Sequence, residues 1–213
     1  MPPVPGATRV HIVGEPPPCP IGAGIDGALV SGGSDLEDRM VDVGGAGGKK
    51  AGQHPASCPE CGAEGVGGAE GCNAVFREVV GREFSQPELF QVHRLTVDAY
   101  SLQHPAEYMK SAKSAVAHLM GMCWAMERSD GPHVARAMSR FLDGTPKFER
   151  PDPPPPLSRG ELNVTYIHSA PDSRAHISRV KKWARGAWEA WHEHHDQARQ
   201  WVMEAQEEGG RNR

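Results

Sequence analysis

The aromatic residues of this chain are confined to the part after Ser57, which limits where a packed core can form. None of its 13 Phe, Trp and Tyr residues lies in segment 1–57, which instead holds 12 Gly and 8 Pro. About a third of that segment therefore consists of residues that interrupt helices and strands. Such a segment buries too little apolar surface to offset the entropy lost on ordering. We predict that residues 1–57 form a disordered extension.

Residues 58–213 carry all the aromatic side chains and suit a single domain with a core of its own. Met40 is an alternative start, in which case residues 1–39 are not translated, and the sequence leaves both possibilities open. The formal net charge of -4 provides no overall positive field for nucleic acid. The basic run at 179–185 is interpreted as the solvated face of a helix, so we expect no nucleic-acid partner.

The chain shows no sign of a targeting or membrane segment. Its first residues lack the charged stretch and the apolar stretch of a signal peptide. The most apolar run, 115–126, includes His118 and is shorter than the roughly 20 residues that a membrane span needs. We expect a cytoplasmic protein, and in a reducing compartment clustered cysteines favour metal or redox chemistry over structural disulfides.

Hydrophobic periodicity indicates an all-α fold, because no alternating pattern runs longer than about four residues. We predict a helical bundle of about five helices, with a zinc-knuckle-like, Cys-rich loop at 58–72 on its N-terminal side. Ser85 with Glu88 is typical of a capping box, Ser173 is a further cap, and segment 143–160 is a Pro-rich, extended connection. The expected helices are 73–82, 86–104, 106–128, 132–142 and 174–206.

The second of these helices contains "HRLTVDAYSLQH", the densest run of chemically active side chains. At 100° per residue one side is apolar, and a polar side pairs Arg94 with Asp98 at i,i+4. The third side carries His93, Tyr100 and His104. These three residues either line a pocket, hold a metal, or are buried polar groups with ordinary hydrogen-bond partners. Two of the three sides are suited to burial, which indicates a central helix.

The motif "SCPECG" supplies two cysteines, Cys58 and Cys61, at the C-x-x-C spacing, and Cys72 follows. Three thiolates within 15 residues suit zinc, which prefers four tetrahedral ligands. The alternative is a redox dithiol, which requires the C-x-x-C at the start of a helix. We do not expect "GAEGVGGAEG" to start one, so zinc is the preferred interpretation.

A fourth ligand is missing from the motif, and the candidates are His93, His104, His54 and Cys123. A continuous helix separates His93 from His104 by about 16 Å, so one ion does not bind both. We favour His93, which lies near the start of its helix on an inward face. Cys123 is expected to be a small buried apolar residue, and His54 belongs to the extension.

The motif "WHEHHD", residues 191–196, contains His-Glu but is not the H-E-x-x-H pattern of metalloproteases. That pattern requires a histidine four residues after His192, where this chain has Asp196. His192 together with His195 or Asp196 remains a possible metal pair. The preferred interpretation is a polar helix face beside the tryptophans.

The chain resembles the DUF5946 family, a bacterial family without an assigned function. Three features carry the resemblance: the three early cysteines, "HRLTVDAYSLQH" at 93–104 and "WARGAWEAW" at 183–191. The resemblance implies a helical domain and supports a site along the central helix. It also implies that the family signature includes His93, Asp98, Tyr100, Gln103 and His104.

Two functions from different classes follow. The first is a zinc-stabilised helical binding module for a small molecule or a protein partner. The second is an enzyme that uses His104, Tyr100 or Asp98 for proton transfer or metal-assisted hydrolysis. Four protein ligands would indicate a structural zinc, whereas an open position would indicate a catalytic one. The oligomeric state is left open.

The extension is expected to be dispensable for folding because its composition does not support a core. Limited proteolysis followed by mass spectrometry should leave a stable fragment that begins shortly before Cys58. Protection of segment 1–57 from the protease would contradict this prediction.

Overall fold

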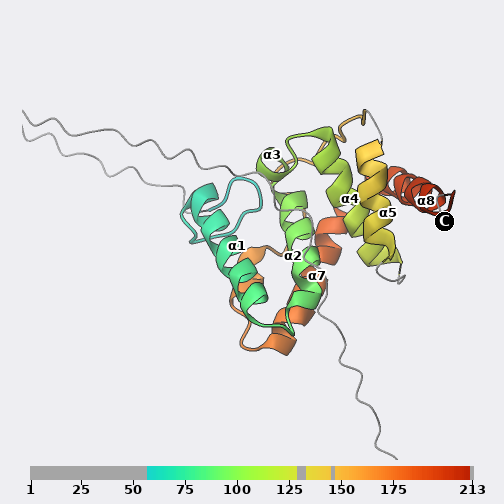
Figure 1. The fold of residues 1–213 in the computed structure, drawn as a ribbon. Coiled ribbons are helices and arrows are strands. Elements are labelled where there is room, and N and C mark those ends of the chain that lie inside the picture. The colour runs from blue at the N-terminus through green and yellow to red at the C-terminus, as the bar shows by residue number, and fades with distance from the viewer. Residues whose placement is uncertain (1–56, 129–132, 145–146, 212–213) are drawn as a thin grey trace, which may run out of the picture. The chain divides into compact units, whose positions relative to one another are not determined.

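The all-α prediction is confirmed by a computed structural model, which describes residues 57–128, 133–144 and 147–211 (Figure 1). The described residues contain no strand, only an isolated bridge between Ser57 and Glu64. None of their helices combines the length and the apolar character required to cross a membrane. The predictions for 1–56, including those on Met40 and His54, lie outside the described residues. The helices are α1 (Gly68–Ser85), α2 (Phe90–Gln103), α3 (Pro105–Tyr108), α4 (Ala112–Glu127), α5 (His133–Gly144), α6 (Val164–His168), α7 (Ser173–Glu189) and α8 (His195–Arg211), with a 3-10 turn η1 (His192–His194) before α8.

Helix α2 is the central helix, as its sequence predicts. It packs against α1, α4 and α7, and Figure 1 shows it running between α1 and α7. Its apolar residues Val92, Ala99 and Leu102 are buried in the core. Helices α4, α5 and α8 form the neighbouring part of the same domain, where α8 packs on both of the others. The fold therefore places both ends of α2 against other segments.

The predicted capping box at the start of α2 is wrong. Helix α1 continues to Ser85, whose hydroxyl donates to the carbonyl of Arg82 at 2.9 Å. Helix α2 begins after Leu89, without a side-chain cap. Glu88 accepts a hydrogen bond from Ser173 on α7 at 3.0 Å instead. Glu88, which the local pattern predicts to be a capping residue, thus takes part in a long-range contact with α7 instead.

Two predicted helices are each divided in two, which raises the number above five. Segment 106–128 breaks before α4, where Ser111 is extended and its hydroxyl oxygen accepts from the Ser114 amide at 3.0 Å. Asp172, rather than Ser173, caps α7. The final helix breaks at Trp191, whose buried indole donates to the Leu102 carbonyl at 3.1 Å. This bond holds the end of α7 on α2, whereas α8 turns to pack on α4 and α5.

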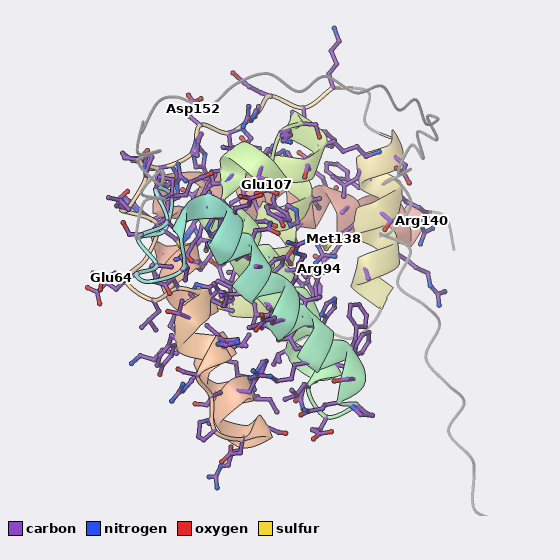
Figure 2. All side chains as sticks on the ribbon, turned by 90° about the vertical axis from the view of Figure 1, so that its left-hand side faces the viewer. Glu64, Arg94, Glu107, Met138, Arg140 and Asp152 are labelled. Atoms are coloured by element: carbon purple, nitrogen blue, oxygen red, sulfur yellow. The ribbon has the colours of Figure 1, made fainter. Side chains whose placement is uncertain are left out.

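The predicted Pro-rich connection overlaps the end of α5 at 143–144, and from residue 147 on it is extended and mostly exposed; Figure 2 shows Asp152 on the outside of the molecule. Its last part is not solvated, because Arg159 is buried. The Arg159 guanidinium pairs with Glu60 of the Cys loop at 2.6 Å and donates to the Gln103 carbonyl at 3.1 Å. The Gln103 amide nitrogen donates to the carbonyls of Arg159 and Leu162 at 3.0 and 2.7 Å. The connection is therefore fastened to the C-terminal end of α2.

Gln103 also accepts a hydrogen bond from the Trp183 indole of α7 at 2.9 Å. Replacing it with leucine would leave that N–H and two carbonyls without partners in a buried place, at about 1–3 kcal/mol for each buried orphan group. We expect Gln103→Leu to lower the free energy of unfolding by about 2–4 kcal/mol, measured by urea denaturation. The matched control is Gln200→Leu, an exposed glutamine bonded to Glu204. Equal effects of the two changes would contradict this role for Gln103.

Candidate metal centre

The Cys loop forms a tight turn that presents two sulfurs on one side. The Cys58 amide donates to the Ala63 carbonyl at 2.8 Å, and the Gly62 amide donates to the Cys58 carbonyl at 2.9 Å. Gly62 has a φ of +73°, a left-handed conformation that glycine adopts without steric cost. The Pro and Gly residues of the motif therefore bend the chain so that Cys58 and Cys61 lie together.

Cys72 reaches the same point from the first turns of α1. The helix begins at Gly68, so the expectation that the glycine-rich stretch starts no helix is wrong. The preceding Gly67 has a φ of +81° and ends the loop in a left-handed conformation. The C-x-x-C itself still lies in the loop rather than at the helix start, so the structural context of a redox dithiol is not present.

His104 is the fourth side chain at this point. It is the C-cap residue of α2, followed by Pro105 as the sequence predicts. The His104 Nε2 atom lies 3.6 Å from Cys58 Sγ and 3.5 Å from Cys72 Sγ. Cys61 Sγ lies 3.7 Å from Cys72 Sγ. All four side chains are buried, and their ligand atoms lie within 4.8 Å of one another.

These spacings can be compared with those of a tetrahedral metal site. Zinc bonds of about 2.3 Å to sulfur and 2.0–2.1 Å to nitrogen imply edges of about 3.8 Å between sulfurs and about 3.6 Å between sulfur and nitrogen. The three separations given above agree with those edges within about 0.1 Å. All four cysteines of the described residues are free. The residues therefore fit a metal ion that prefers sulfur and nitrogen ligands.

Hydrogen bonds orient the His104 ring for this role. Its Nδ1 atom donates to the Tyr100 carbonyl at 2.9 Å, which leaves Nε2 facing the sulfurs. Burial by itself lowers the pKa of His104, but hydrogen bonds to Cys58 and Cys72 outweigh it and raise the pKa to about 9. Hydrogen bonds from Cys61 and Cys72 lower the pKa of Cys58. Hydrogen bonds to Cys58 and Cys72 raise the pKa of Cys61, so a thiolate is favoured at Cys58, beside the positive charge of His104.

Tyr100 lies directly behind the candidate ligands. Its hydroxyl donates to Cys72 Sγ at 3.7 Å. Its ring stacks between Phe76 and His104, with centroid distances of 3.8 and 3.9 Å. Burial raises the pKa of Tyr100, and the charge of the Cys72 sulfur adds to the effect. This candidate catalytic residue therefore contacts the metal ligands and holds its proton.

The structure does not bring His93, the favoured fourth ligand, to the cysteines. Its Nδ1 atom donates to the Glu83 carboxylate at 3.1 Å, near the opposite end of α2 from His104. The continuous helix keeps the two histidines apart, as the spacing argument requires. Cys123 is buried in α4 outside the cluster, and burial raises its pKa to about 11. The fourth candidate ligand is thus His104 in place of His93.

A family model with the description "Family of unknown function (DUF5946)" matches residues 56–192. The chain belongs to this family. The matched region spans the three cysteines, all of α2 and α7. No curated protein and no solved structure matches the chain. The DUF5946 assignment therefore confirms the family but supplies no activity.

In this DUF5946 domain, Asp98 is buried rather than exposed on the polar side of α2, with 1% of its surface accessible. Its carboxylate pairs with Arg94 at 2.7 Å, as predicted, and with His118 of α4 at 2.8 Å. A Cβ atom added to Gly121 would lie 2.4 Å from Asp98 Oδ2, so the glycine permits the close approach of α4. Asp98 therefore joins α2 to α4, and no local pattern identifies His118 as its partner, because the two residues are 20 positions apart.

The histidines of "WHEHHD" bind backbone groups and do not gather around a site. His194 Nε2 donates to the Asp152 carbonyl at 2.8 Å. His195 stacks on Trp188 at 3.8 Å between ring centroids. Asp196 pairs with Arg199 at 2.6 Å. Within the part of the chain that the structure describes, these residues form no group with metal-ligand spacing.

A structural role for Asp98 can be tested with Asp98→Asn, which keeps the size but removes the charge that Arg94 and His118 face. We expect the free energy of unfolding to fall by about 1–3 kcal/mol, measured by urea denaturation, with no change in metal content. The control Asp143→Asn removes an exposed pair with Lys113, for which we expect a change below about 1 kcal/mol. Unaltered stability of Asp98→Asn would contradict the structural role.

Proposed function

We propose that this protein is a zinc-stabilised helical binding module in which Cys58, Cys61, Cys72 and His104 hold one zinc ion. The observation that carries the proposal is the spacing of the four ligand atoms, which fits a tetrahedral ion. Four protein ligands close a zinc site and leave no position for water. The role of the ion is therefore to hold the fold together.

The zinc ion would join the Cys loop and the start of α1 to the end of α2, more than 30 positions further along the chain. Cys58 and Cys61 belong to the loop, Cys72 to α1 and His104 to the end of α2. The loop is rich in glycine and contributes few apolar side chains, so its ligands would add to the Glu60–Arg159 pair in holding its position. Because such a site does not exist in the unfolded chain, metal binding contributes to the free energy of folding.

Zinc suits the donor set better than other common metals. Three thiolates and one imidazole are ligands for zinc, whereas magnesium and calcium prefer oxygen. A thiolate site needs reduced cysteines, and the described cysteines are free. This supports the expected cytoplasmic location. The net charge of -4 agrees with a small molecule or protein as partner rather than nucleic acid.

The closed ligand set counts against the alternative, a metal-assisted hydrolase. A catalytic zinc keeps a position for water or substrate, whereas here four side chains supply the ligands. His104 would be a ligand, Tyr100 donates to Cys72 Sγ, and Asp98 is paired with Arg94 and His118. Each of the three candidate catalytic residues is thus engaged in a structural contact.

The purified protein is expected to contain about one zinc ion per chain, measured by elemental analysis. Cys61→Ser and His104→Ala should each weaken zinc binding at least about 100-fold, more than the loss of an outer-shell partner usually does. A competing chromophoric chelator would measure the affinity. His93→Ala is the matched control, because His93 bonds to Glu83 at the other end of α2, and it should retain zinc.

Zinc loss in His93→Ala together with full retention in His104→Ala would contradict the ligand set. Full retention in both Cys61→Ser and His104→Ala would remove the proposed site altogether. A chelator should lower the melting temperature of the wild-type protein but not that of Cys61→Ser. An unchanged melting temperature of the wild-type protein would contradict the stabilising role.

A further inference from the structure

A second polar cluster lies at the end of α1, away from the metal centre. Glu83 is fully buried there, and three donors converge on its carboxylate. The Thr96 hydroxyl lies 2.6 Å away, His176 Nε2 2.8 Å and His93 Nδ1 3.1 Å. Burial by itself raises the pKa of Glu83, but these hydrogen bonds outweigh it and lower the pKa. The carboxylate is therefore ionised and fixes the orientation of the His176 ring.

His176 has one ring nitrogen that accepts no hydrogen bond from the described residues. Its Nε2 atom carries the proton donated to Glu83, so Nδ1 is an acceptor in the neutral ring. This Nδ1 atom has no hydrogen-bond partner among the described residues. Only 1% of the residue is exposed, so bulk water does not replace the missing partner. Such a buried acceptor costs about 1–3 kcal/mol and calls for an explanation such as a bound group.

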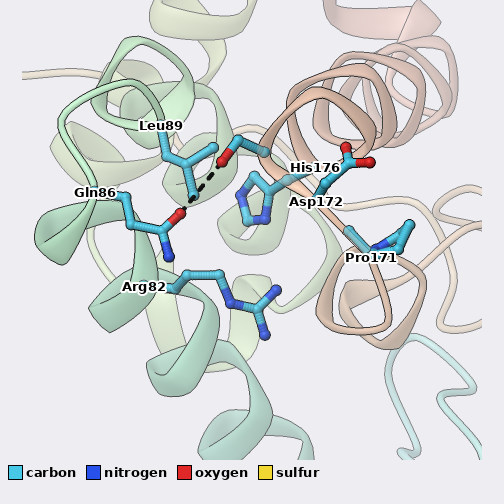
Figure 3. Close-up of a pocket in the computed structure, with 8 residues that line it drawn as sticks. Arg82, Gln86, Leu89, Pro171, Asp172 and His176 are labelled. Atoms are coloured by element: carbon cyan, nitrogen blue, oxygen red, sulfur yellow. Dashed lines mark hydrogen bonds between the residues drawn. The ribbon is translucent and has the colours of Figure 1, made fainter.

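The His176 ring borders a cavity of about 320 Å³ between the end of α1 and the start of α7. Its wall also includes Arg82, Gln86, Leu89 and Pro171. Figure 3 shows the His176 ring facing the space between Gln86 and Arg82. A volume of this order suits a small organic ligand.

Arg82 supplies the positive charge of the wall. Its two terminal nitrogens both donate to the His168 carbonyl at 3.2 Å. The other three of the five guanidinium N–H groups have no hydrogen bond to the described residues. Asp172 also lines the cavity, but Figure 3 shows its carboxylate on the other side of the His176 ring from Arg82. One cation with an acidic group nearby favours a monoanion over a dianion.

We propose that this cavity binds a small carboxylate that carries a hydroxyl or ammonium group. The ligand carboxylate bonds to the guanidinium of Arg82, and its hydroxyl or ammonium group donates to Nδ1 of His176. Glu83 acts as a positioning residue, because it holds the His176 proton on the opposite nitrogen. The site shares no residue with the proposed zinc centre, so it stands independently of that proposal and identifies a class of small-molecule partner.

Three probes of similar size test the two parts of the ligand. Lactate offers a hydroxyl donor, alanine an ammonium donor, and propionate a carboxylate alone. Each would be titrated into the ¹⁵N-labelled full chain, and the shift of His176 Nδ1 followed by NMR. We expect lactate or alanine to move this resonance and to bind at least about 10-fold more tightly than propionate, since propionate leaves the acceptor unpaired. Tighter binding of lactate would indicate a hydroxy acid as the ligand, and tighter binding of alanine would indicate an amino acid.

A matched variant separates the acceptor from the fold. In His176→Gln the amide nitrogen can replace Nε2 as the donor to Glu83, but no atom replaces Nδ1. We expect this variant to lose at least about 10-fold in affinity for the preferred probe, with propionate binding unchanged. His192→Gln, at an exposed position outside the cavity, should bind all probes like the wild-type protein.

Equal binding of the preferred probe by His176→Gln and the wild-type protein would overturn the proposal. Failure of all three probes to bind the wild-type protein at about 10 mM would overturn it as well, because even a Kd of about 10 mM would be detected at that concentration. If His176→Gln does not fold, the wild-type series decides alone. Propionate binding as tightly as lactate and alanine would then refute the role of Nδ1.

Discussion

The cluster of His104 and three cysteine sulfurs joins the Cys loop, α1 and the end of α2. The loop before α1 has few apolar side chains, and α1 and α2 run between this contact and the Glu83 cluster. Three pairs of sulfur and nitrogen atoms in the cluster lie 3.5 to 3.7 Å apart. Among the described residues, no other group of side chains with metal-ligand spacing is found. A cation there would neutralise the thiolates and fix all three segments at once.

The last turn of α2 organises the surroundings of that contact. The Tyr100 carbonyl orients His104, and the Tyr100 ring stacks on it. Gln103 bonds to the connection before α6 and to Trp183 of α7. Arg159 closes the arrangement by pairing with Glu60 in the loop. Tyr100, Gln103 and His104, which lie within about one helical turn, thus contact different neighbours, and this explains the density of polar side chains in "HRLTVDAYSLQH".

The two ends of α2 carry two different kinds of polar centre. At one end, soft sulfur and imidazole ligands surround a point that suits a metal ion. At the other end, Glu83 accepts hydrogen bonds from Thr96, His93 and His176, and Nδ1 of His176 is left without a partner among the described residues. Asp98 lies between them and fastens α2 to α4. Buried polar groups in this helix are therefore paired across helices, which makes its position specific.

Spacing and periodicity determined much of this protein from the sequence alone. They predicted the all-α class, the central position of α2, the three cysteines of the site and the Arg94–Asp98 pair, because these depend on residues close together in the chain. The same local rules also showed that His93 and His104 do not share one ion. They did not reveal which of the two meets the cysteines, since both lie on one side of the helix.

The tertiary structure decided that question through contacts between distant residues. Glu60 pairs with Arg159 across 99 positions of the sequence, which holds the Cys loop at the C-terminal end of α2, beside His104. Glu83 and His176 are 93 positions apart, so no local pattern brings them together. The break at Trp191 likewise depends on its bond to Leu102. Such pairings depend on how the helices pack, and packing is a property of the whole chain rather than of any segment.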